Sequence, residues 1–343
     1  MEVISREKPS TMEGQQAADS SSLKKIFEPF KDDIKAFNNH FSDVMRSDVK
    51  IIDEVAKYIV KHKGKQFRPA LVLVAARAAG EITTATYTTA AVVELLHTAS
   101  LVHDDVLDDS ELRRGFRTIH KVWKNKIAIL MGDYLLSKSL IAATETGSLQ
   151  VMNTIATVAK RLIKGAIFEV QKSRKLDLTE EDYYKLIGDK TASLIAACCE
   201  LGALTVEAPE AERDALRQYG ENLGIAFQIK DDLLDFQSSS GVLGKPAMAD
   251  IQDKKVTLPL LYALKAGPEK EAKKIFKMVK KGADKKDLKY IMAFINQHQG
   301  LEKAQQKANE LKDDAIDAIA ILPETPARHS LAAIAEFVVS RKK

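Results

Sequence analysis

Apolar residues recur at every third or fourth position along most of the chain, which is the spacing of one buried face of an α-helix. One such series is Ala91, Leu95, Ala99 and Val102. No proline occurs between Pro69 and Pro209, so long helices can run through this region without losing backbone hydrogen bonds. The pattern therefore predicts an all-α fold.

Glycine, proline and short polar stretches mark where these helices are expected to end. The expected breaks lie near residues 80–81, 147–148, 176–179, 208–209, 238–246 and 267–268. The β-branched segment at residues 83–89 is compatible with a strand, but the helical pattern on both sides favours a helix start. No Asn-Gly or Asp-Gly dipeptide signals a hairpin.

The N-terminal residues differ from the rest of the chain. Residues 1–22 hold few large apolar side chains, and their acidic residues outnumber the basic ones, which argues against a transit peptide. We expect them to form a disordered tail. No linker and no repeat of fixed period divides the remainder, so residues 23–343 are expected to form one large helical domain.

Composition narrows the class of protein. With 343 residues, 45% of them hydrophobic and 29% charged, the chain can bury a large core and remain soluble. The 52 basic and 48 acidic residues leave a net charge of +4, which does not suggest a protein that coats nucleic acid. Cys198 and Cys199 are the only cysteines, so we expect a cytoplasmic protein without disulfides. The longest apolar runs are shorter than the ~20 residues of a membrane span.

Two acidic clusters share one spacing. Asp104, Asp105 and Asp108 follow one helical apolar stretch, and residues 231–235 repeat the pattern after another, with Asp231, Asp232 and Asp235. A single cluster would read equally well as a solvated helix end. Two clusters of carboxylates without nearby His or Cys pairs instead favour a hard cation such as Mg²⁺, bound together with substrate phosphates.

Basic residues accompany both clusters. Each pair alone would be read as a solvated face, but beside two acidic clusters they are suited to bind phosphate. These residues are Lys65, Arg68, Arg113, Arg114, Lys190, Lys245 and Lys255. The sequence therefore predicts that the two carboxylate clusters bind a phosphorylated ligand from two sides through metal ions.

Taken together, these motifs resemble those of trans-isoprenyl diphosphate synthases of the polyprenyl, long-chain type, over residues 25–343. The matching segments are 64–69, 94–97 through 115, 132–133, 188–191, 224–235, 243–246 and 255–259. The resemblance implies an all-α fold around a central cavity, a homodimer, and Mg²⁺-dependent head-to-tail prenyl transfer with about three Mg²⁺ ions. It also implies that pyrophosphate acts as the base, so no dedicated catalytic base is needed.

The resemblance also assigns roles by position. Asp104, Asp108 and Asp231 would bind Mg²⁺, supported by Asp105, Asp232 and Asp235. The allylic diphosphate would be held by Arg113, Lys190, Thr191, Gln228, Lys245 and Lys255. Isopentenyl diphosphate would be held by Lys65, Arg68, His97 and Arg114. The chain departs from the family pattern at Lys63, Gln66 and Lys254, so the choice between Lys254 and Lys255 stays open, with Lys255 preferred.

Product length is predicted from the residues just before the first cluster. In short-chain relatives an aromatic ring often stands at the position of Ala99, where it closes the tunnel. Here Ala99 and Ser100 are small, so we expect a product longer than C15, of about C30–C40, with a C15–C20 product as the alternative. Close helix packing is the other explanation for these small residues. The lysine-rich segment 269–289 is expected to be a solvated face, or at most a transient contact with membrane surfaces.

Three other functions fit the sequence less well. A terpene cyclase would typically carry an Asn/Ser/Glu-type second metal motif and would not need Lys65, Arg68 and His97. A noncatalytic partner subunit would be expected to have lost part of one cluster, and a helical-repeat scaffold would show a period. Because both clusters are complete, a catalytic synthase is favoured.

Overall fold

The structure, a computed structural model, describes residues 22–62, 64–175, 177–237 and 248–342. Its elements, in chain order, are η1 (Glu28–Phe30), α2 (Lys31–Val44), α3 (Lys50–Lys61), α4 (Phe67–Ala79), α5 (Thr84–Leu107), β1 (Leu112–Arg113), β2 (Phe116–Arg117), α6 (Ile119–Glu145), α7 (Leu149–Lys175), α8 (Glu180–Ile187), η2 (Gly188–Ala192), α9 (Ser193–Leu204), α10 (Glu210–Gln237), α11 (Ala249–Gln252), α12 (Leu258–Ala266), α13 (Glu269–Lys281), α14 (Lys285–Gln297), α15 (Gly300–Ala318), η3 (Ile319–Ile321) and α16 (Pro326–Ser340). The predicted all-α architecture is confirmed.

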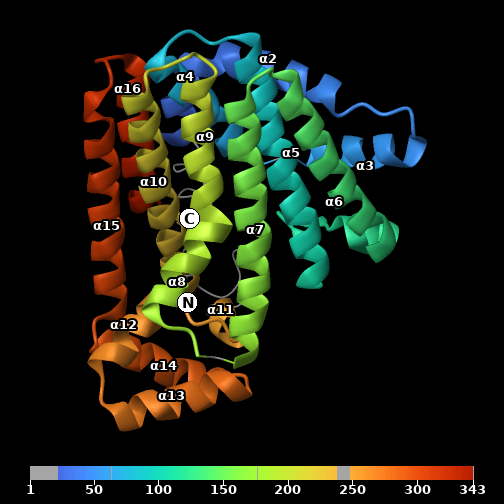
Figure 1. Cartoon of the computed structure of the whole chain (residues 1–343). Helices are drawn as coiled ribbons and strands as arrows, with labels where there is room; N and C mark the ends of the chain where they lie inside the picture. The colour runs from blue at the N-terminus through green and yellow to red at the C-terminus, as the bar shows by residue number, and fades with distance from the viewer. Residues whose placement is uncertain (1–21, 63, 176, 238–247, 343) are drawn as a thin grey trace, which may run out of the picture.

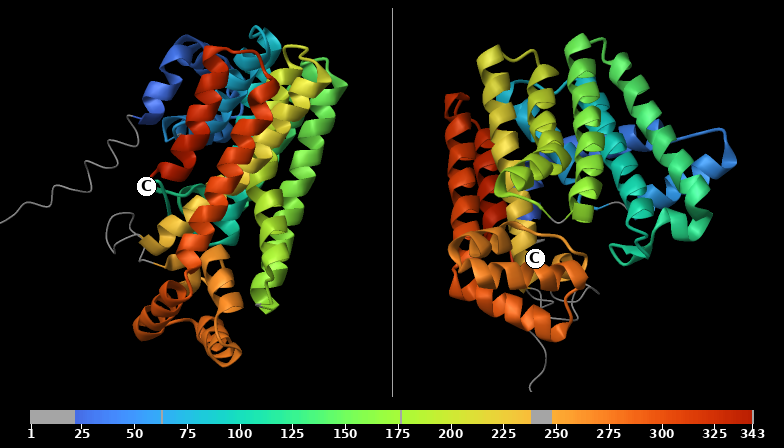
Figure 2. Two further views of the ribbon diagram at one scale, coloured as in Figure 1. Left: turned by 90° about the vertical axis from the view of Figure 1, so that its left-hand side faces the viewer. Right: turned by 60° about the horizontal axis from the view of Figure 1, so that its bottom comes forward.

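Long helices run side by side through the middle of the molecule (Figures 1 and 2). Helix α9 packs between α4 and α10, α10 also packs against α15, and α5 packs along α6. Residues 71–76 of α4 are completely buried, so this helix is apolar on every side and lies inside the bundle. Helices α12, α13 and α14 form a smaller group at the end of the bundle where α5 and α7 end (Figure 1).

The helix start predicted at residues 83–89 is confirmed. Thr83 is the N-cap of α5 and forms a capping box with Thr86, which satisfies backbone donors that a helix start leaves unpaired. Breaks also occur near Gly80, Gly147, residues 177–179, Pro209 and Gly267, as expected. The break expected at residues 238–246 and the tail expected at residues 1–22 lie outside the described residues, except that Ser22 is helical.

The structure contains one short hairpin that the sequence did not predict. β1 and β2 pair antiparallel around Arg114 and Gly115, which both have left-handed φ values of 54° and 82°. A two-residue turn with two positive φ angles suits a hairpin, but usually carries Asn-Gly rather than Arg-Gly. The usual dipeptide signal was therefore missing.

Helix α6 has unusual composition for a helix that is largely on the surface. An 18-residue window in it has a mean hydropathy of 1.4, and 39% of that window is buried. By length and composition it is the one candidate membrane span among the described residues, which is weak evidence because helices of soluble proteins pass the same test. It was not anticipated because Asp133 and Lys138 interrupt its apolar runs.

Candidate active site

The first acidic cluster lies at the C-terminal end of α5. The N–H of Asp108, the C-cap, donates to the carbonyl of Asp104 at 2.9 Å, so these two residues lie one helical turn apart, as predicted. Asp105 is buried and accepts two hydrogen bonds from Nε of Arg113, at 2.8 and 3.0 Å. Arg113 therefore ties the hairpin to α5 by fixing the middle carboxylate.

The second cluster lies near the C-terminal end of α10, and its central carboxylate is held by two donors. The hydroxyl of Tyr183 donates to Asp232 at 2.6 Å, and the amide of Gln228 donates to it at 2.9 Å. Gln228 lies one turn before Asp232 on α10, which brings its amide within reach. Gly224, one turn earlier still, lets α10 approach η2, because a Cβ at this position would lie 2.5 Å from Cα of Ala192. Any larger residue at 224 would push the two elements apart.

The outer carboxylates of the second cluster have different partners. Asp231 accepts a hydrogen bond of 2.5 Å from the guanidinium of Arg341, close to the C-terminus. Asp235 accepts the backbone N–H groups of Ala249 and Asp250, each at 3.2 Å, and so fixes the start of α11. Asp231 is thus paired with a largely buried arginine side chain, whereas Asp235 holds the returning backbone.

The π-helical turn η2 connects the two clusters through consecutive residues. Nζ of Lys190 lies 3.8 Å from a carboxylate oxygen of Asp104, in the first cluster. The hydroxyl of Thr191 donates at 2.9 Å to Gln228, which in turn holds the second cluster. One turn of backbone therefore places the two clusters and the lysine in a single site.

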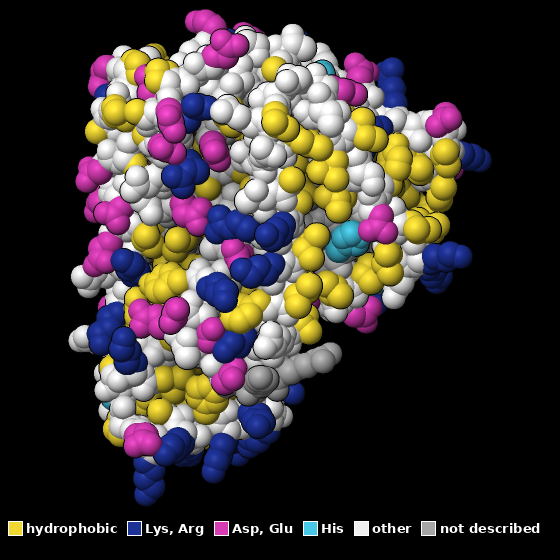
Figure 3. All heavy atoms as spheres, viewed as in Figure 1, with side chains coloured by type: hydrophobic (Ala, Val, Ile, Leu, Met, Phe, Trp, Pro, Cys, Tyr) yellow, Lys and Arg dark blue, Asp and Glu magenta, His cyan; other side chains and the backbone are white. Residues whose placement is uncertain are grey.

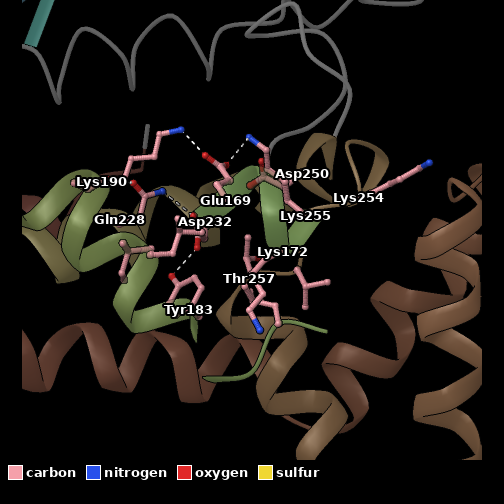
Figure 4. Close-up of a pocket in the computed structure, with 15 residues that line it drawn as sticks. Glu169, Lys172, Tyr183, Lys190, Gln228, Asp232, Asp250, Lys254, Lys255 and Thr257 are labelled. Atoms are coloured by element: carbon pink, nitrogen blue, oxygen red, sulfur yellow. Dashed lines mark hydrogen bonds and ion pairs between the residues drawn. The ribbon is translucent and has the colours of Figure 1, made fainter. Parts of the chain in front are cut away.

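Glu169 of α7 joins two lysines in this site (Figure 4). It accepts a hydrogen bond of 2.5 Å from Lys190, and its other oxygen lies 3.7 Å from Nζ of Lys255. Burial lowers the pKa of Lys255, but Glu169 and neighbouring aspartates outweigh it and raise that pKa. Lys254, at a left-handed φ of 60°, lines the same pocket but extends away from this group, and Lys255 is the residue that lies near Glu169.

A second group of basic residues lies beside the first cluster. Nη1 of Arg68 lies 2.9 Å from Nε2 of His97, and Nε of Arg68 is buried without a partner among the described residues. The guanidinium of Arg114 lies directly against Gly64, where a Cβ would come within 2.6 Å of it. Lys65, next in the chain, is exposed. The structure thus brings three of the four residues predicted for isopentenyl diphosphate together, with Lys65 at the rim.

An apolar cavity of about 600 Å³ opens next to these polar residues. Asp104, Lys190 and Thr191 lie at its polar end, and Ser100 forms part of its wall. Ala99 is 2% exposed, packs into the core and is not among the residues that line this cavity, so its place in the tunnel stays a prediction. Successive residues of a helix are rotated by about 100°, so Ala99 points away from the cavity that Ser100 faces. The remaining wall comes mainly from α5, through Leu101, His103, Val106 and Leu107, and from α7, through Leu162, Ile163, Ala166, Ile167 and Val170.

The outer rim of this cavity is exposed apolar surface. Ile163, Ile167 and Val170 are 53%, 64% and 45% exposed, and further exposed apolar side chains continue along α6 and α7. We call this surface the α6–α7 face; besides those three it includes Ile129, Leu130, Ile141 and Leu149. Figure 3 shows hydrophobic side chains gathered over this part of the molecule. Exposed apolar patches of this kind usually mark an interaction surface.

The electrostatics of both clusters favour a bound cation. Each cluster lies at the C-terminal, negative end of its helix dipole, where carboxylates are unfavourable. Burial raises the pKa of Asp104, although Lys190 opposes it, and burial raises the pKa of Asp232 to about 7. A set of carboxylate oxygens is what Mg²⁺ prefers. Among the described residues no three such side chains converge on one metal position, so a cation here would need further oxygens from the substrate.

Several residues of the site were not predicted from the sequence. Glu169, Tyr183 and Arg341 each bind a predicted residue directly, but none lies near either acidic cluster in the sequence. Their distance along the chain from their partners, 110 residues for Arg341, left no local signal. Lys245, a predicted phosphate ligand, lies outside the described residues.

Known proteins share this arrangement of helices and motifs. The sequence model of the family described as polyprenyl synthetase matches residues 49–295. The chain belongs to this family. Octaprenyl diphosphate synthase of Escherichia coli is 35% identical to this polyprenyl synthetase over 321 residues, which cover 94% of this chain and 99% of the relative.

Solved structures match along nearly the whole chain. The crystal structure of a decaprenyl diphosphate synthase from Rhodobacter capsulatus has a TM-score of 0.88 and 36% identity, covering 94% of this chain and 99% of that one. A polyprenyl synthase from Caulobacter crescentus, solved with calcium and isoprenyl diphosphate, has a TM-score of 0.86 and 33% identity, covering 94% and 98%. The predicted fold, and the prediction of an enzyme of the trans-polyprenyl diphosphate synthase class, are therefore confirmed.

Proposed function

We propose that this polyprenyl synthetase condenses isopentenyl diphosphate head-to-tail onto an allylic diphosphate, and extends it to a polyprenyl diphosphate longer than C15, of about C30–C40. The observation that carries this proposal is η2, whose Lys190 reaches the first acidic cluster while Thr191 reaches the second through Gln228. An allylic diphosphate bound at this turn would contact both clusters and point its hydrocarbon into the apolar cavity.

The site residues then divide into two binding groups. Lys190, Thr191, Gln228 and Lys255 hold the allylic diphosphate in this proposal, together with Arg113 and Lys245. Arg68, His97 and Arg114, with Lys65 at the rim, hold isopentenyl diphosphate. The buried, unpartnered Nε of Arg68 supports this assignment, because a guanidinium N–H buried without an acceptor is costly unless an anion binds it.

The reaction breaks the allylic C–O bond, and pyrophosphate leaves with the electron pair. The double bond of isopentenyl diphosphate then attacks the allylic carbon, and the proton lost in the last step passes to pyrophosphate. Lys190 and Lys255 place positive charge where the leaving group gains negative charge, which lowers the barrier. The apolar wall keeps water away from the carbocation.

Asp104, Asp108 and Asp231 are the residues that we propose to hold Mg²⁺, about three ions in all with the diphosphate. When bound, Mg²⁺ neutralises the diphosphate and stabilises the charge of the departing pyrophosphate. The oxygen-only donor set and the position of the carboxylates at helix C-termini support this choice of ion. The calcium in the solved Caulobacter crescentus relative is consistent with a divalent site.

We propose that the protein is a cytoplasmic homodimer joined through the α6–α7 face. That face exposes seven large apolar residues that a second copy would cover, and the open rim of the cavity lies within it. A growing hydrocarbon would meet water at this rim in a single copy, so a partner that covers the rim would also complete the cavity.

The lysine-rich segment 269–289 lies on α13 and α14, at the bottom of the molecule in Figure 1. Lys281 pairs with Asp287, and Lys274 lies over the ring of Tyr290, which leaves other lysines toward solvent. We propose at most a transient contact with anionic membrane surfaces. Sedimentation with anionic vesicles at low and high salt tests this contact. Binding that does not weaken at high salt would contradict it.

The test of the function is incorporation of radiolabelled isopentenyl diphosphate onto C5, C10, C15 and C20 allylic primers with Mg²⁺, with products separated by chromatography. We expect products beyond C20, and none when the metal is removed with EDTA. Products that stop at C15–C20 would favour a short-chain synthase. No incorporation with any primer would contradict the proposed function itself.

A further inference from the structure

Glu169 stands between two lysines that the proposed function assigns to the allylic diphosphate. It lies on α7, and its side chain is 22% exposed. One carboxylate oxygen accepts a 2.5 Å hydrogen bond from Lys190, and the other lies 3.7 Å from Nζ of Lys255. The lysines come from η2 and from the segment before α12, so this carboxylate joins two elements that are distant in the sequence.

The contact has a direct consequence for an anionic ligand. A lysine ammonium has three N–H donors but one positive charge, so when it binds a phosphate oxygen its charge is divided between the phosphate and its carboxylate partner. Among the residues that the structure describes, the other carboxylate within 4.0 Å of Nζ of Lys190 is Asp104, at 3.8 Å, which belongs to the first acidic cluster. Glu169 also carries a negative charge inside the space that a diphosphate would enter, since it lines the same pocket as Asp108 and Lys255.

We propose that Glu169 is a positioning residue whose carboxylate occupies the place of a diphosphate oxygen between the two lysines. It holds Lys190 and Lys255 in position while the site is empty, and pairs with them again when pyrophosphate leaves. The inference rests on the proposed function. This arrangement should speed product release, since Lys190 and Lys255 exchange pyrophosphate for the Glu169 carboxylate instead of being left without an anion. Its cost is weaker binding of every diphosphate.

Glu169→Gln keeps the size of the side chain and removes the charge, so it tests this role directly. We expect the inhibition constant of pyrophosphate to fall about tenfold, because one competing charge close to the ligand is removed in a partly exposed site. The KM for the allylic diphosphate should fall in parallel, and kcat should fall with it as release slows. Glu169→Asp keeps the charge and should stay close to the wild type.

Glu180→Gln is the matched control, because Glu180 pairs with Lys265 at 3.0 Å on the surface and lines no part of this site. It should leave both constants unchanged. A Glu169→Gln enzyme that turns over with an unchanged or raised pyrophosphate inhibition constant would overturn the inference alone. If the wild type neither incorporates isopentenyl diphosphate nor is inhibited by pyrophosphate, the proposed function fails instead.

Discussion

Nη1 of Arg68 donates a 2.9 Å hydrogen bond to Nε2 of His97, from α4 to α5. Arginine has no acceptor, so Nε2 of His97 carries no proton and the ring proton is on Nδ1. His97 is therefore neutral in this structure and offers one N–H to a ligand. The positive charge of this group comes from the arginines alone.

The pH dependence of stability follows from this contact. Burial, and the charges of Arg68 and Arg114, hold the pKa of His97 well below its usual 6.5. The unfolded chain therefore binds this proton first, and the contribution of His97 to stability is complete above pH 6.5 and is lost as the pH falls below it. An NMR titration of the imidazole signals measures the pKa of His97 in the folded protein, and the His97→Asn variant assigns the signal. A ring that titrates near 6.5 in the folded protein would contradict the buried contact.

The two acidic clusters are predicted to be equally necessary. Asp104→Asn and Asp231→Asn should each lower kcat/KM about 100-fold to 1,000-fold, as does the loss of other groups that stabilise transition-state charge. Asp109→Asn is the matched control, since Asp109 is exposed and pairs with Lys121 outside the site. Full activity of either cluster variant, with an unchanged circular dichroism spectrum, would refute its assignment.

Product length is predicted to depend on Ser100 and not on Ala99. Ser100→Phe places a ring in the cavity and should shorten the product, while the first condensation continues. Ala99→Phe inserts a ring into the core, so we expect a loss of about 1–3 kcal/mol in stability, measured by denaturant unfolding, and a smaller change of product length. Chromatography of the products separates the two effects. The reverse result would place the tunnel on the other side of α5.

The acid side of the pH profile is predicted to report Asp232. Its pKa is raised to about 7 mainly by burial, although Tyr183 and Gln228 stabilise the ionised form. Since kcat/KM reports the free enzyme, it should rise with pH through about 7. Tyr183→Phe removes the 2.6 Å hydrogen bond and should move this rise to higher pH. Tyr184→Phe is the control, because the hydroxyl of Tyr184 meets Tyr262 instead, and its profile should match the wild type.

The α6–α7 face is predicted to join two copies of the chain. Two lysines in place of Leu130 and Ile141, which are 54% and 61% exposed, should produce monomers in analytical ultracentrifugation, because buried unpaired charges are costly. Ile321→Lys, at a residue that is 60% exposed on η3, is the control and should leave the mass unchanged. A wild type that sediments as a monomer at all concentrations would rule out this face as a dimer interface.

Much of the candidate site could be predicted because its chemistry is local in sequence. Helical spacing places Asp104 and Asp108 one turn apart whatever surrounds them, and the hydrogen bond between them bears this out. For the neighbouring Ala99 and Ser100, periodicity gives the angle between the two residues and does not say which of them faces the cavity. The hairpin around Arg114 was not predicted from the sequence, because an unusual turn residue is tolerated when tertiary contacts hold it.

Local sequence patterns are enough to predict the helical architecture, the two carboxylate clusters and the family, because apolar period and motif spacing depend only on nearby residues. The side-chain partners emerge only from the three-dimensional packing: Glu169 between Lys190 and Lys255, Arg341 on Asp231, and Ser100 on the cavity wall. These contacts join residues that are distant in the sequence, and they depend on how the helices pack and rotate, which no local pattern encodes.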